Sequence, residues 1–259
     1  MRIPFVKMNA QGNDFAILDI RGESEVRFDP ILLAKDICDR RFGVGADGLV
    51  LLTDSAIAAA RMLIYNADGS RAIMCGSALR CISSLLHKQE GITEALIETD
   101  AGIRRINISG ENIKVSLGTP RLVFANVVVE ELSGCLVDVG NYHFVCYGQS
   151  LEDEPHLRYG PVFEHHPDLP GAVNSHFVRV ISPQEISIKI WEHGVGATIA
   201  CGTGAAACVL CGRNMGILSD SVIVNMPGGA VNIAYQPDGE CILSGTVSEA
   251  FSGEYLWKT

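Results

Sequence analysis

The feature that most constrains this chain is a short pattern that occurs twice. The stretch MCGSALRCISS begins at Met74, and ACGTGAAACVL begins at Ala200. In each, a Cys-Gly pair stands at the head of a run of small and apolar residues, and the two cysteines, Cys75 and Cys201, are 126 positions apart. A chain of 259 residues that starts the same local structure once in each half is expected to be an internal duplication.

The residues that follow each cysteine predict a helix. After Cys201 the run 205–210 is apolar on every side, which is typical of a buried helix, and Gly216 marks its end. The apolar positions after Cys75 instead follow the three- and four-residue spacing of an amphipathic helix: Ala78, Cys81, Ile82, Leu85 and Leu86.

Further landmarks recur in the same order in both halves. QGNDFAI resembles VGNYHFV, and their asparagines, Asn13 and Asn141, are 128 positions apart. A polar residue stands nine positions before each cysteine: Asn66 in the first half and Glu192 in the second. An ordered set of matches at nearly constant spacing indicates two copies of one structural unit.

The repeat predicts an α+β protein with two pseudo-symmetric lobes, residues 1–117 and 118–259, each built around a central helix that starts after a cysteine. Asp29-Pro30 predicts a further helix running toward Arg41. Short β-rich runs bounded by Gly, Asn and Asp predict strands at 15–20, 48–52, 61–65 and 112–117.

Composition excludes several classes of function. The net charge is −10 and the basic residues form no cluster larger than a pair, so a nucleic-acid partner is not expected. The stretch MRIPFVKMNAQGNDF lacks the apolar core of a signal peptide, and charges interrupt every longer apolar run. We therefore expect a cytoplasmic protein without a membrane segment, whose nine cysteines are reduced thiols.

Two thiols at two helix starts have a chemical consequence. The first turn of a helix presents unpaired N–H groups and a partial positive charge, which lower the pKa of a thiol and can hold a carboxylate. Gly76 and Gly202 leave room for a ligand to approach the backbone. If the lobes face each other, one thiolate can remove a proton from a carbon while the opposite thiol returns one to its other face. This predicts an enzyme that inverts the α-carbon of a small amino acid without a cofactor.

Other interpretations stay open from the residues alone. Cys75 with His143 could act as a cysteine hydrolase, and a non-catalytic amino-acid binding protein could keep the same fold. The Cys-x-x-Cys at 208–211 lies inside an apolar helix, which disfavours a redox motif, and GVGADG at 43–48 follows no buried strand, which disfavours dinucleotide binding. A zinc site would need a second ligand pair at suitable spacing, so no metal is expected.

Seven stretches, spread over nearly the whole chain, follow one another in a specific order. They are KMNAQGNDF (7–15), RFGVGADGL (41–49), NADGSRAIMCGSALRC (66–81), GNYH (140–143), VNSHF (173–177), WEHGVGATIACGTGAAAC (191–208) and MPGG (226–229). In this order and spacing they resemble the diaminopimelate epimerase family, the cofactor-independent two-cysteine amino-acid epimerases. The resemblance implies that each lobe is a curved, mostly antiparallel sheet around its central helix, and that the enzyme is a homodimer.

The resemblance also implies roles for individual residues. Cys75 and Cys201 would be the base and the acid of the exchange, and His143 and Glu192 would lie beside them and position the amino group. Backbone N–H groups of four residues would hold the reacting carboxylate: Gly76, Ser77, Gly202 and Thr203. The polar ends of the substrate would be bound by Asn13, Asn66, Asn141 and Asn174. The implied reaction interconverts LL- and meso-diaminopimelate, a precursor of lysine and peptidoglycan.

Several positions depart from the family pattern. The family usually has Asn and Gly where Ser77 and Ala78 stand, and Pro and Glu where Tyr142 and Ala197 stand. His193 replaces an Arg that would grip the distal carboxylate of diaminopimelate, and an imidazole lacks the bidentate fork of a guanidinium. An epimerase or racemase acting on another amino acid, such as histidine, is therefore an alternative, with His193 as a specificity residue.

Overall fold

The structure is a computed structural model that describes residues 1–23 and 27–258. The chain forms two compact units: unit 1 contains Met1–Val115 and Gly245–Thr259, and unit 2 contains Ser116–Ser244. Within the described residues, none of the helices is long and apolar enough to cross a lipid bilayer.

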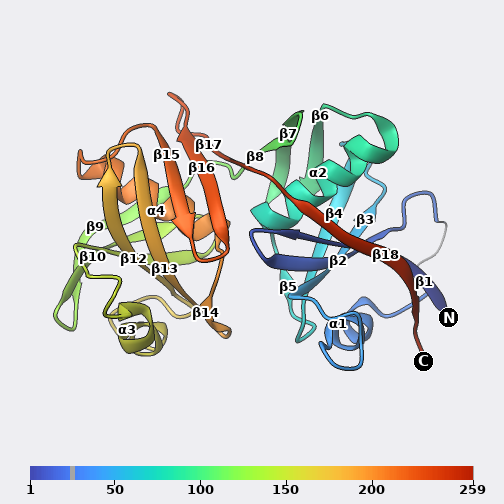
Figure 1. Cartoon of the computed structure of the whole chain (residues 1–259), viewed down its shortest axis with the longest axis horizontal. Helices are drawn as coiled ribbons and strands as arrows, with labels where there is room; N and C mark the ends of the chain where they lie inside the picture. Colours follow the sequence, from blue (N-terminus) through green and yellow to red (C-terminus); the bar gives the residue numbers. More distant parts are fainter. Residues whose placement is uncertain (24–26, 259) are drawn as a thin grey trace. The chain divides into compact units, whose positions relative to one another are not determined.

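Within its described residues, unit 1 is a sheet of nine strands with two helices (Figure 1). Its strands pair in the order β18-β1-β2-β3-β4-β6-β7-β8, and the short β5 pairs with β4 beside β6. The pairs β2–β3 and β4–β6 are parallel and the others are antiparallel. The elements are β1 (Arg2–Ala10), β2 (Asn13–Asp19), α1 (Pro30–Cys38), β3 (Gly48–Thr53), β4 (Ala60–Asn66), β5 (Arg71–Ala72), α2 (Gly76–Glu90), β6 (Glu94–Thr99), β7 (Gly102–Ser109), β8 (Asn112–Ser116) and β18 (Ser248–Leu256).

Unit 2 repeats this plan. Its strands pair in the order β9-β10-β11-β12-β13-β15-β16, β17 follows β16, and the short β14 pairs with β13 beside β15. Again two pairs are parallel, β11–β12 and β13–β15. The elements are β9 (Arg121–Val129), β10 (Leu132–Asp138), β11 (Tyr142–Tyr147), α3 (Pro155–Glu164), β12 (Asn174–Ser182), β13 (Glu185–Glu192), β14 (Gly196–Thr198), α4 (Gly202–Asn214), β15 (Ser221–Met226), β16 (Gly229–Tyr235) and β17 (Cys241–Gly245).

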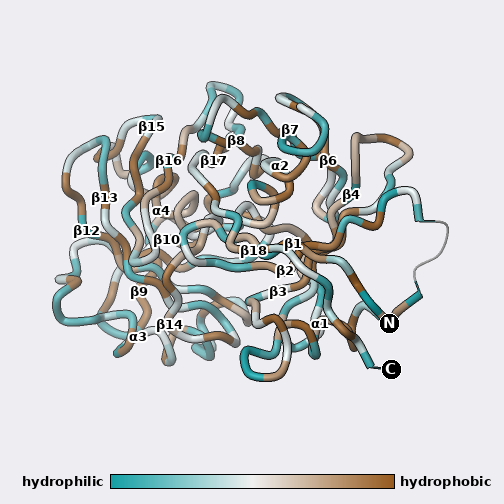
Figure 2. Tube along the Cα trace, turned by 45° about the vertical axis from the view of Figure 1, so that its right-hand side comes forward, coloured by the Kyte–Doolittle hydropathy of each residue, from teal (hydrophilic) through white to brown (hydrophobic). Residues whose placement is uncertain are grey.

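The predicted fold class is confirmed. In each unit a mostly antiparallel sheet packs against a helix that starts after a cysteine: α2 contacts β1, β2 and β7, and α4 contacts β10, β11, β12 and β16. Strand sequences fit this packing, because β13 buries the apolar side chains of Ile186, Ile188 and Ile190, while the residues that alternate with them are half-buried. Figure 2 colours the chain by the hydropathy of each residue.

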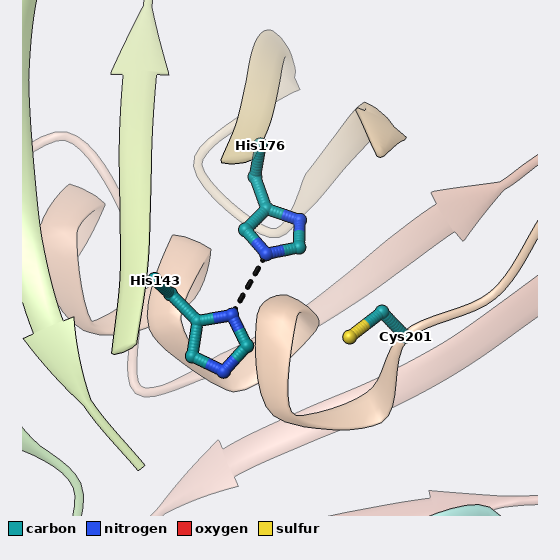
Figure 3. A group of neighbouring side chains, drawn as sticks. All are labelled: His143, His176 and Cys201. Atoms are coloured by element: carbon teal, nitrogen blue, oxygen red, sulfur yellow. Dashed lines mark hydrogen bonds between the residues drawn. The ribbon is translucent and has the colours of Figure 1, made fainter. Parts of the chain in front are cut away.

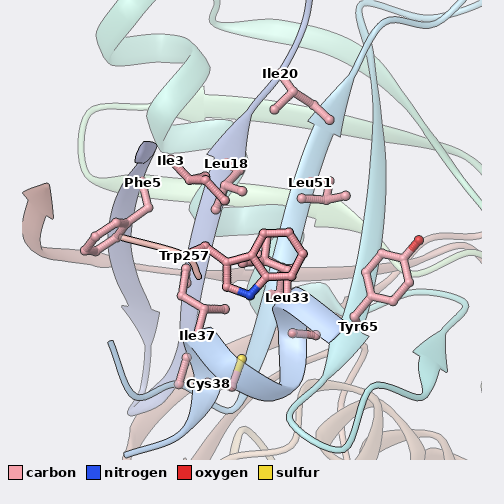
Figure 4. Close-up of a cluster of buried hydrophobic side chains, with 14 residues drawn as sticks. Ile3, Phe5, Leu18, Ile20, Leu33, Ile37, Cys38, Leu51, Tyr65 and Trp257 are labelled. Atoms are coloured by element: carbon pink, nitrogen blue, oxygen red, sulfur yellow. The ribbon is translucent and has the colours of Figure 1, made fainter. Parts of the chain in front are cut away.

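A second helix completes the hydrophobic core of each unit. In unit 1, Leu33 and Ile37 of α1 pack with Leu18 of β2, Leu51 of β3 and Trp257 (Figure 4). Asp29 caps α1 by accepting hydrogen bonds from the N–H groups of Ile31 and Leu32, as Asp29-Pro30 predicts. The core of unit 2 places Phe163 of α3 against Phe144 and Phe177.

Two boundaries differ from the sequence prediction. The helix α1 ends at Cys38 rather than near Arg41, because the Asp39 carboxylate accepts the N–H groups of Arg41 and Phe42 and turns the chain. The second lobe was predicted as 118–259, but residues 245–259 belong to unit 1. The reason is that β18 pairs with β1 along its whole length, from Arg2 opposite Leu256 to Asn9 opposite Ser248. The sequence pattern did not reveal that this last strand returns to the first one.

Candidate active site

Cys75 is the N-cap residue of α2. Its backbone is extended (φ −145°), its carbonyl accepts the N–H of Leu79 at 2.9 Å, and its side chain is half-buried. Gly76 and Ser77, the predicted carboxylate cradle of this unit, occupy the first turn, where backbone N–H groups have no acceptor inside the helix. The first turn carries no acidic residue, so its positive end is not neutralised from within α2.

Cys201 is the N-cap residue of α4 and repeats this geometry. Its φ is −143°, and its carbonyl accepts the N–H of Ala205 at 2.9 Å. Gly202 and Thr203 form the first turn, again without an acidic residue, and the Thr203 hydroxyl lies 3.6 Å from the Cys201 sulfur. The two Cys-Gly stretches thus fold as the sequence predicts, each with its thiol at the start of a helix.

The environment of Cys201 disfavours its ionised form. Burial raises the pKa of this thiol well above the ordinary value, and the negative charge of Glu192 raises it further, while Thr203 and the Gly204 N–H act in the opposite direction. Glu192 ends β13 and accepts a hydrogen bond from the Thr198 hydroxyl, which holds the carboxylate beside the thiol. The structure therefore brings together three of the predicted site residues of unit 2: Cys201, Glu192 and Thr203.

His143 lies in the same group and is buried in a line of hydrogen bonds (Figure 3). Its Nε2 lies 2.9 Å from Oδ1 of Asn141, and its Nδ1 lies 2.8 Å from Nε2 of His176. Because the Asn141 oxygen only accepts, His143 carries its proton on Nε2 and its Nδ1 accepts from His176. Burial lowers the pKa of His143, and it lowers that of His176 to about 3, so both rings are neutral at physiological pH.

His176 is a site residue that the sequence analysis missed. It stands two positions after Asn174 on β12, so both side chains lie on one face of the strand, and this spacing was the available signal. Its ring lies against Gly204 in the first turn of α4, where a Cβ would be 2.1 Å from the ring carbon Cε1. Its Nδ1 is buried and has no hydrogen-bond partner among the described residues.

His143, His176 and Cys201 are also the one group of His, Cys or acidic side chains, within the described part of the chain, that could hold a metal ion. Their candidate ligand atoms lie within 4.8 Å of one another, and all three residues are buried. The hydrogen bond between the rings uses one nitrogen of each imidazole, and Asn141 is bonded to the other nitrogen of His143. Among the ring nitrogens of the group, this leaves Nδ1 of His176 without a hydrogen bond to any described residue.

The remaining predicted binding residues of unit 1 lie at strand ends. Asn13 begins β2, opposite Ala10 of β1, and is half-buried. Asn66 ends β4 and is exposed, and its side-chain amide donates to the Ser70 hydroxyl at 2.9 Å within the turn that follows. The structure thus gives Asn66 a partner in its own turn.

His193 and Asn174 are joined in unit 2. Oδ1 of Asn174 accepts the backbone N–H of His193 at 3.1 Å, and the Asn174 amide donates to the carbonyl of Tyr142. The imidazole of His193 is exposed, and its Nδ1 lies 3.2 Å from Oε1 of Glu164. Glu164 was not foreseen from the sequence, because it comes from α3, 29 positions away.

Glu164 is held as a carboxylate. Burial raises its pKa, but hydrogen bonds from the Gly194 N–H (2.8 Å) and the Trp191 indole (2.7 Å) outweigh this effect and leave the pKa lowered. A fixed negative charge therefore stands next to the position that the sequence analysis assigned to specificity.

Comparison with known proteins identifies the family. The family model described as diaminopimelate epimerase matches residues 5–123 and 135–249. A protein of Desulforudis audaxviator named diaminopimelate epimerase is 40% identical, with 97% of this chain and 99% of that protein aligned. The protein of the same name from Carboxydothermus hydrogenoformans is 38% identical over 97% of this chain and 99% of its own length.

Solved structures share the fold at low sequence identity. A phenazine biosynthesis protein of the PhzF family from Bacillus anthracis superposes with a TM-score of 0.76 at 16% identity, covering 99% of this chain and all of that one (100%). A hydroxyproline epimerase from Agrobacterium vitis gives 0.73 at 14% identity, covering 98% of this chain and 92% of its own. On the sequence match, which spans nearly the whole chain, this protein belongs to the diaminopimelate epimerase family of isomerases.

Proposed function

We propose that the enzyme interconverts LL- and meso-diaminopimelate by proton transfer between Cys75 and Cys201, without pyridoxal phosphate. The observation that carries this proposal is the repeated construction of the two units, in which a cysteine caps a helix, a glycine follows it, and the first turn has no acidic residue. Family membership and the names of the relatives support the substrate. With this substrate, the reaction supplies a precursor of lysine and peptidoglycan.

In the proposed reaction, one sulfur acts as a thiolate and removes the α-proton, and the other acts as a thiol and donates a proton to the opposite face of the carbon. The reaction consumes one thiolate and one thiol and leaves the same two species with their roles exchanged. The N–H groups of Gly76, Ser77, Gly202 and Thr203 would hold the α-carboxylate and stabilise the charge that builds on it in the transition state. His143 and Glu192 would orient the amino group.

A solvent-exchange experiment tests this reaction. The protein is incubated with LL-diaminopimelate in D2O, and proton NMR follows the loss of the α-hydrogen signal. We expect deuterium to enter the α-carbon without added cofactor. Cys75→Ala and Cys201→Ala should each lower the epimerisation rate by about 10²-fold or more, since each removes one acid–base group. Full activity of either variant would contradict the two-thiol reaction, and a stable acyl adduct on Cys75 would indicate a hydrolase instead.

A second substrate is favoured by the contact between His193 and Glu164. The carboxylate of Glu164 lies 3.2 Å from His193, where the family pattern would place an arginine that grips a distal carboxylate. A fixed negative charge repels that carboxylate, whereas it tolerates a neutral or cationic side chain. A racemase acting on an amino acid without a distal carboxylate is therefore the alternative.

The variants His193→Arg and Glu164→Gln discriminate between the two substrates in the same NMR assay, with a panel of amino acids. If the second substrate is right, both variants should increase turnover of diaminopimelate relative to the unmodified protein. If diaminopimelate is the natural substrate, its turnover by the unmodified protein should exceed that of every other amino acid in the panel.

A further inference from the structure

Three side chains of unit 2 bring two imidazoles and a thiol together (Figure 3). His143 lies on β11, His176 lies on β12, and Cys201 stands at the start of α4. In Figure 3 the thiol of Cys201 points toward the two rings. One ligand atom from each residue lies within 4.8 Å of the other two, and all three residues are buried. The group therefore gathers nitrogen and sulfur atoms in one buried place.

Nδ1 of His176 is the atom of this group that has an unused lone pair. The hydrogen bonds to Asn141 and between the rings place a proton on Nε2 of His143 and another on Nε2 of His176. Nδ1 of His176 is therefore an unprotonated acceptor, and it is buried without a hydrogen bond from any described residue. A buried acceptor without a partner costs free energy, so its retention needs an explanation. A bound metal cation would supply the partner.

The donor atoms suit Zn²⁺ and similar divalent ions. Proteins bind Zn²⁺ through His nitrogen and Cys sulfur, and three protein ligands leave a fourth position open. Bond lengths of about 2.0–2.3 Å in a tetrahedral site place the ligand atoms about 3.3–3.6 Å apart. Side-chain rotations that move these atoms by about 1 Å bring the group from its 4.8 Å limit to that spacing. His143 would exchange one of its two hydrogen bonds for the metal, whereas His176 would lose none by binding through Nδ1.

The charges around the group favour a cation. The carboxylate of Glu192, which accepts a hydrogen bond from Thr198, places a negative charge beside the sulfur of Cys201. Arg213, the basic residue of α4, stands in the last turn of this helix and pairs with Asp220. A divalent ion at the first turn would therefore be attracted by Glu192, and it would neutralise the thiolate that binds it.

We propose that His143, His176 and Cys201 form a zinc site, and that Zn²⁺ bound there inhibits the enzyme. The ion binds the sulfur as a thiolate, the proton of the thiol leaves to the solvent, and no electron is transferred. The inhibition rests on the proposed function, because a sulfur bound to metal cannot exchange a proton with the α-carbon. Binding of the ion does not depend on that function. Sequence spacing gives no sign of the site, because its ligands come from three separate elements.

Titration with Co²⁺ tests the site on the full chain, reduced and freed of metal with a chelator. Co²⁺ occupies tetrahedral zinc sites, and it shows a thiolate-to-cobalt absorption band when sulfur is one of the ligands. We expect one Co²⁺ to bind per chain with this band. Zn²⁺ should displace the cobalt, whereas Mg²⁺, which prefers oxygen ligands, should not. The absence of a thiolate band from the unmodified protein would overturn the proposal.

Variants locate the ion within the chain. His176→Gln and Cys201→Ala each remove one ligand, and each should lower the affinity for Co²⁺ by about 10²-fold or more, since loss of an outer hydrogen-bond partner alone costs about 10–100-fold. Cys208→Ala is the matched control, because this cysteine is buried on the same helix but lies outside the group. It should bind Co²⁺ as tightly as the unmodified protein does. Loss of the band in Cys208→Ala, or unchanged affinity in His176→Gln, would contradict the assignment.

The NMR assay tests the inhibition. Zn²⁺ that fills the site should abolish α-hydrogen exchange in the unmodified protein and in Cys208→Ala, and a chelator should restore it. Activity that His176→Gln retains should resist Zn²⁺. Full exchange with the site filled would overturn the inhibitory role. If a ligand variant does not fold, the cobalt spectrum of the unmodified protein still decides whether sulfur binds the ion. Cobalt binding with the thiolate band, but no α-hydrogen exchange on any amino acid without metal, would refute the proposed function and leave the metal site standing.

Discussion

At the scale of single residues, charge distinguishes two thiols that the backbone treats alike. Both cysteines cap a helix with nearly the same φ, but Cys75 is half-buried, whereas Cys201 is buried beside the carboxylate of Glu192. Sequence spacing located both cysteines, because helix start signals are local. The spacing could not predict which charged group lies beside each thiol, because the position of Glu192 beside Cys201 depends on how β13 and α4 meet in the folded unit.

Glu192→Gln should make Cys201 easier to ionise. Glu192 raises the pKa of this thiol, so removing its charge while keeping its shape should move the alkylation midpoint of Cys201 to lower pH. Alkylation with iodoacetamide at several pH values, followed by mass spectrometry of the peptide that contains Cys201, measures this midpoint. Glu164→Gln, which removes a carboxylate from the same unit but not from the surroundings of Cys201, should leave the midpoint unchanged, and an equal shift in both variants would contradict the assignment.

His176 should make the stability of the protein depend on pH. Folding lowers its pKa from 6.5 to about 3, so below pH 6.5 the unfolded chain binds a proton that the folded chain does not. The free energy of unfolding should therefore fall as the pH drops from 6.5, by about 1.4 kcal/mol per pH unit for such a group. Urea unfolding at several pH values measures this slope. His176→Gln should give a shallower slope, and an unchanged slope would show that the ring is protonated in the folded protein.

At the scale of elements, the helices could be predicted and the contacts between elements could not. The spacing of apolar residues after Cys75 and the Asp29-Pro30 start signal gave α2 and the beginning of α1, because both are local patterns. The end of α1 was wrong, since side-chain hydrogen bonds of Asp39 end it early. The hydrogen bond between His143 and His176 joins β11 to β12, and no local sequence pattern predicts a contact between two strands.

Gly204→Ala tests the contact between α4 and β12. Alanine is normally favourable inside a helix, but here its Cβ would lie 2.1 Å from the ring of His176. We expect the substitution to destabilise the protein by about 1–3 kcal/mol through overpacking, and to reduce epimerase activity because it displaces the first turn beside Cys201. Thermal unfolding and the NMR assay measure both effects.

Gly171→Ala is the matched control, because a Cβ at Gly171 would meet no atom within 4 Å. It should leave both the melting temperature and the activity close to those of the unmodified protein. Equal melting temperatures of the two variants would mean that His176 can move away from α4 without destabilising the protein.

At the scale of the whole molecule, the two units share one order of strand pairs, including the positions of both parallel pairs. The repeat in the sequence predicted this correspondence, because the landmark residues keep their spacing along the chain. It did not predict how the edge of each sheet is completed. In unit 2 the strand before β10 pairs with it, whereas in unit 1 the same place beside β1 is taken by β18, from the other end of the chain.

The return of the chain end makes Trp257 part of the unit 1 core, although it belongs to the last three residues of the sequence. Its side chain is buried, with 6% of the residue exposed, its indole N–H donates to Asp36 of α1 at 2.7 Å, and its backbone N–H donates to the carbonyl of Met1.

Trp257→Ala should therefore lower the free energy of unfolding by about 3–5 kcal/mol, which is typical of removing a large buried aromatic side chain. Hydrogen exchange followed by mass spectrometry should show lost protection in α1 and β1, with residues 116–244 affected less. The neighbouring Leu256→Ala removes a side chain that is 59% exposed and should change little. If Trp257→Ala reduced protection equally in both units, the two would unfold as one cooperative body, and the division of the chain at residues 115 and 245 would have no thermodynamic meaning.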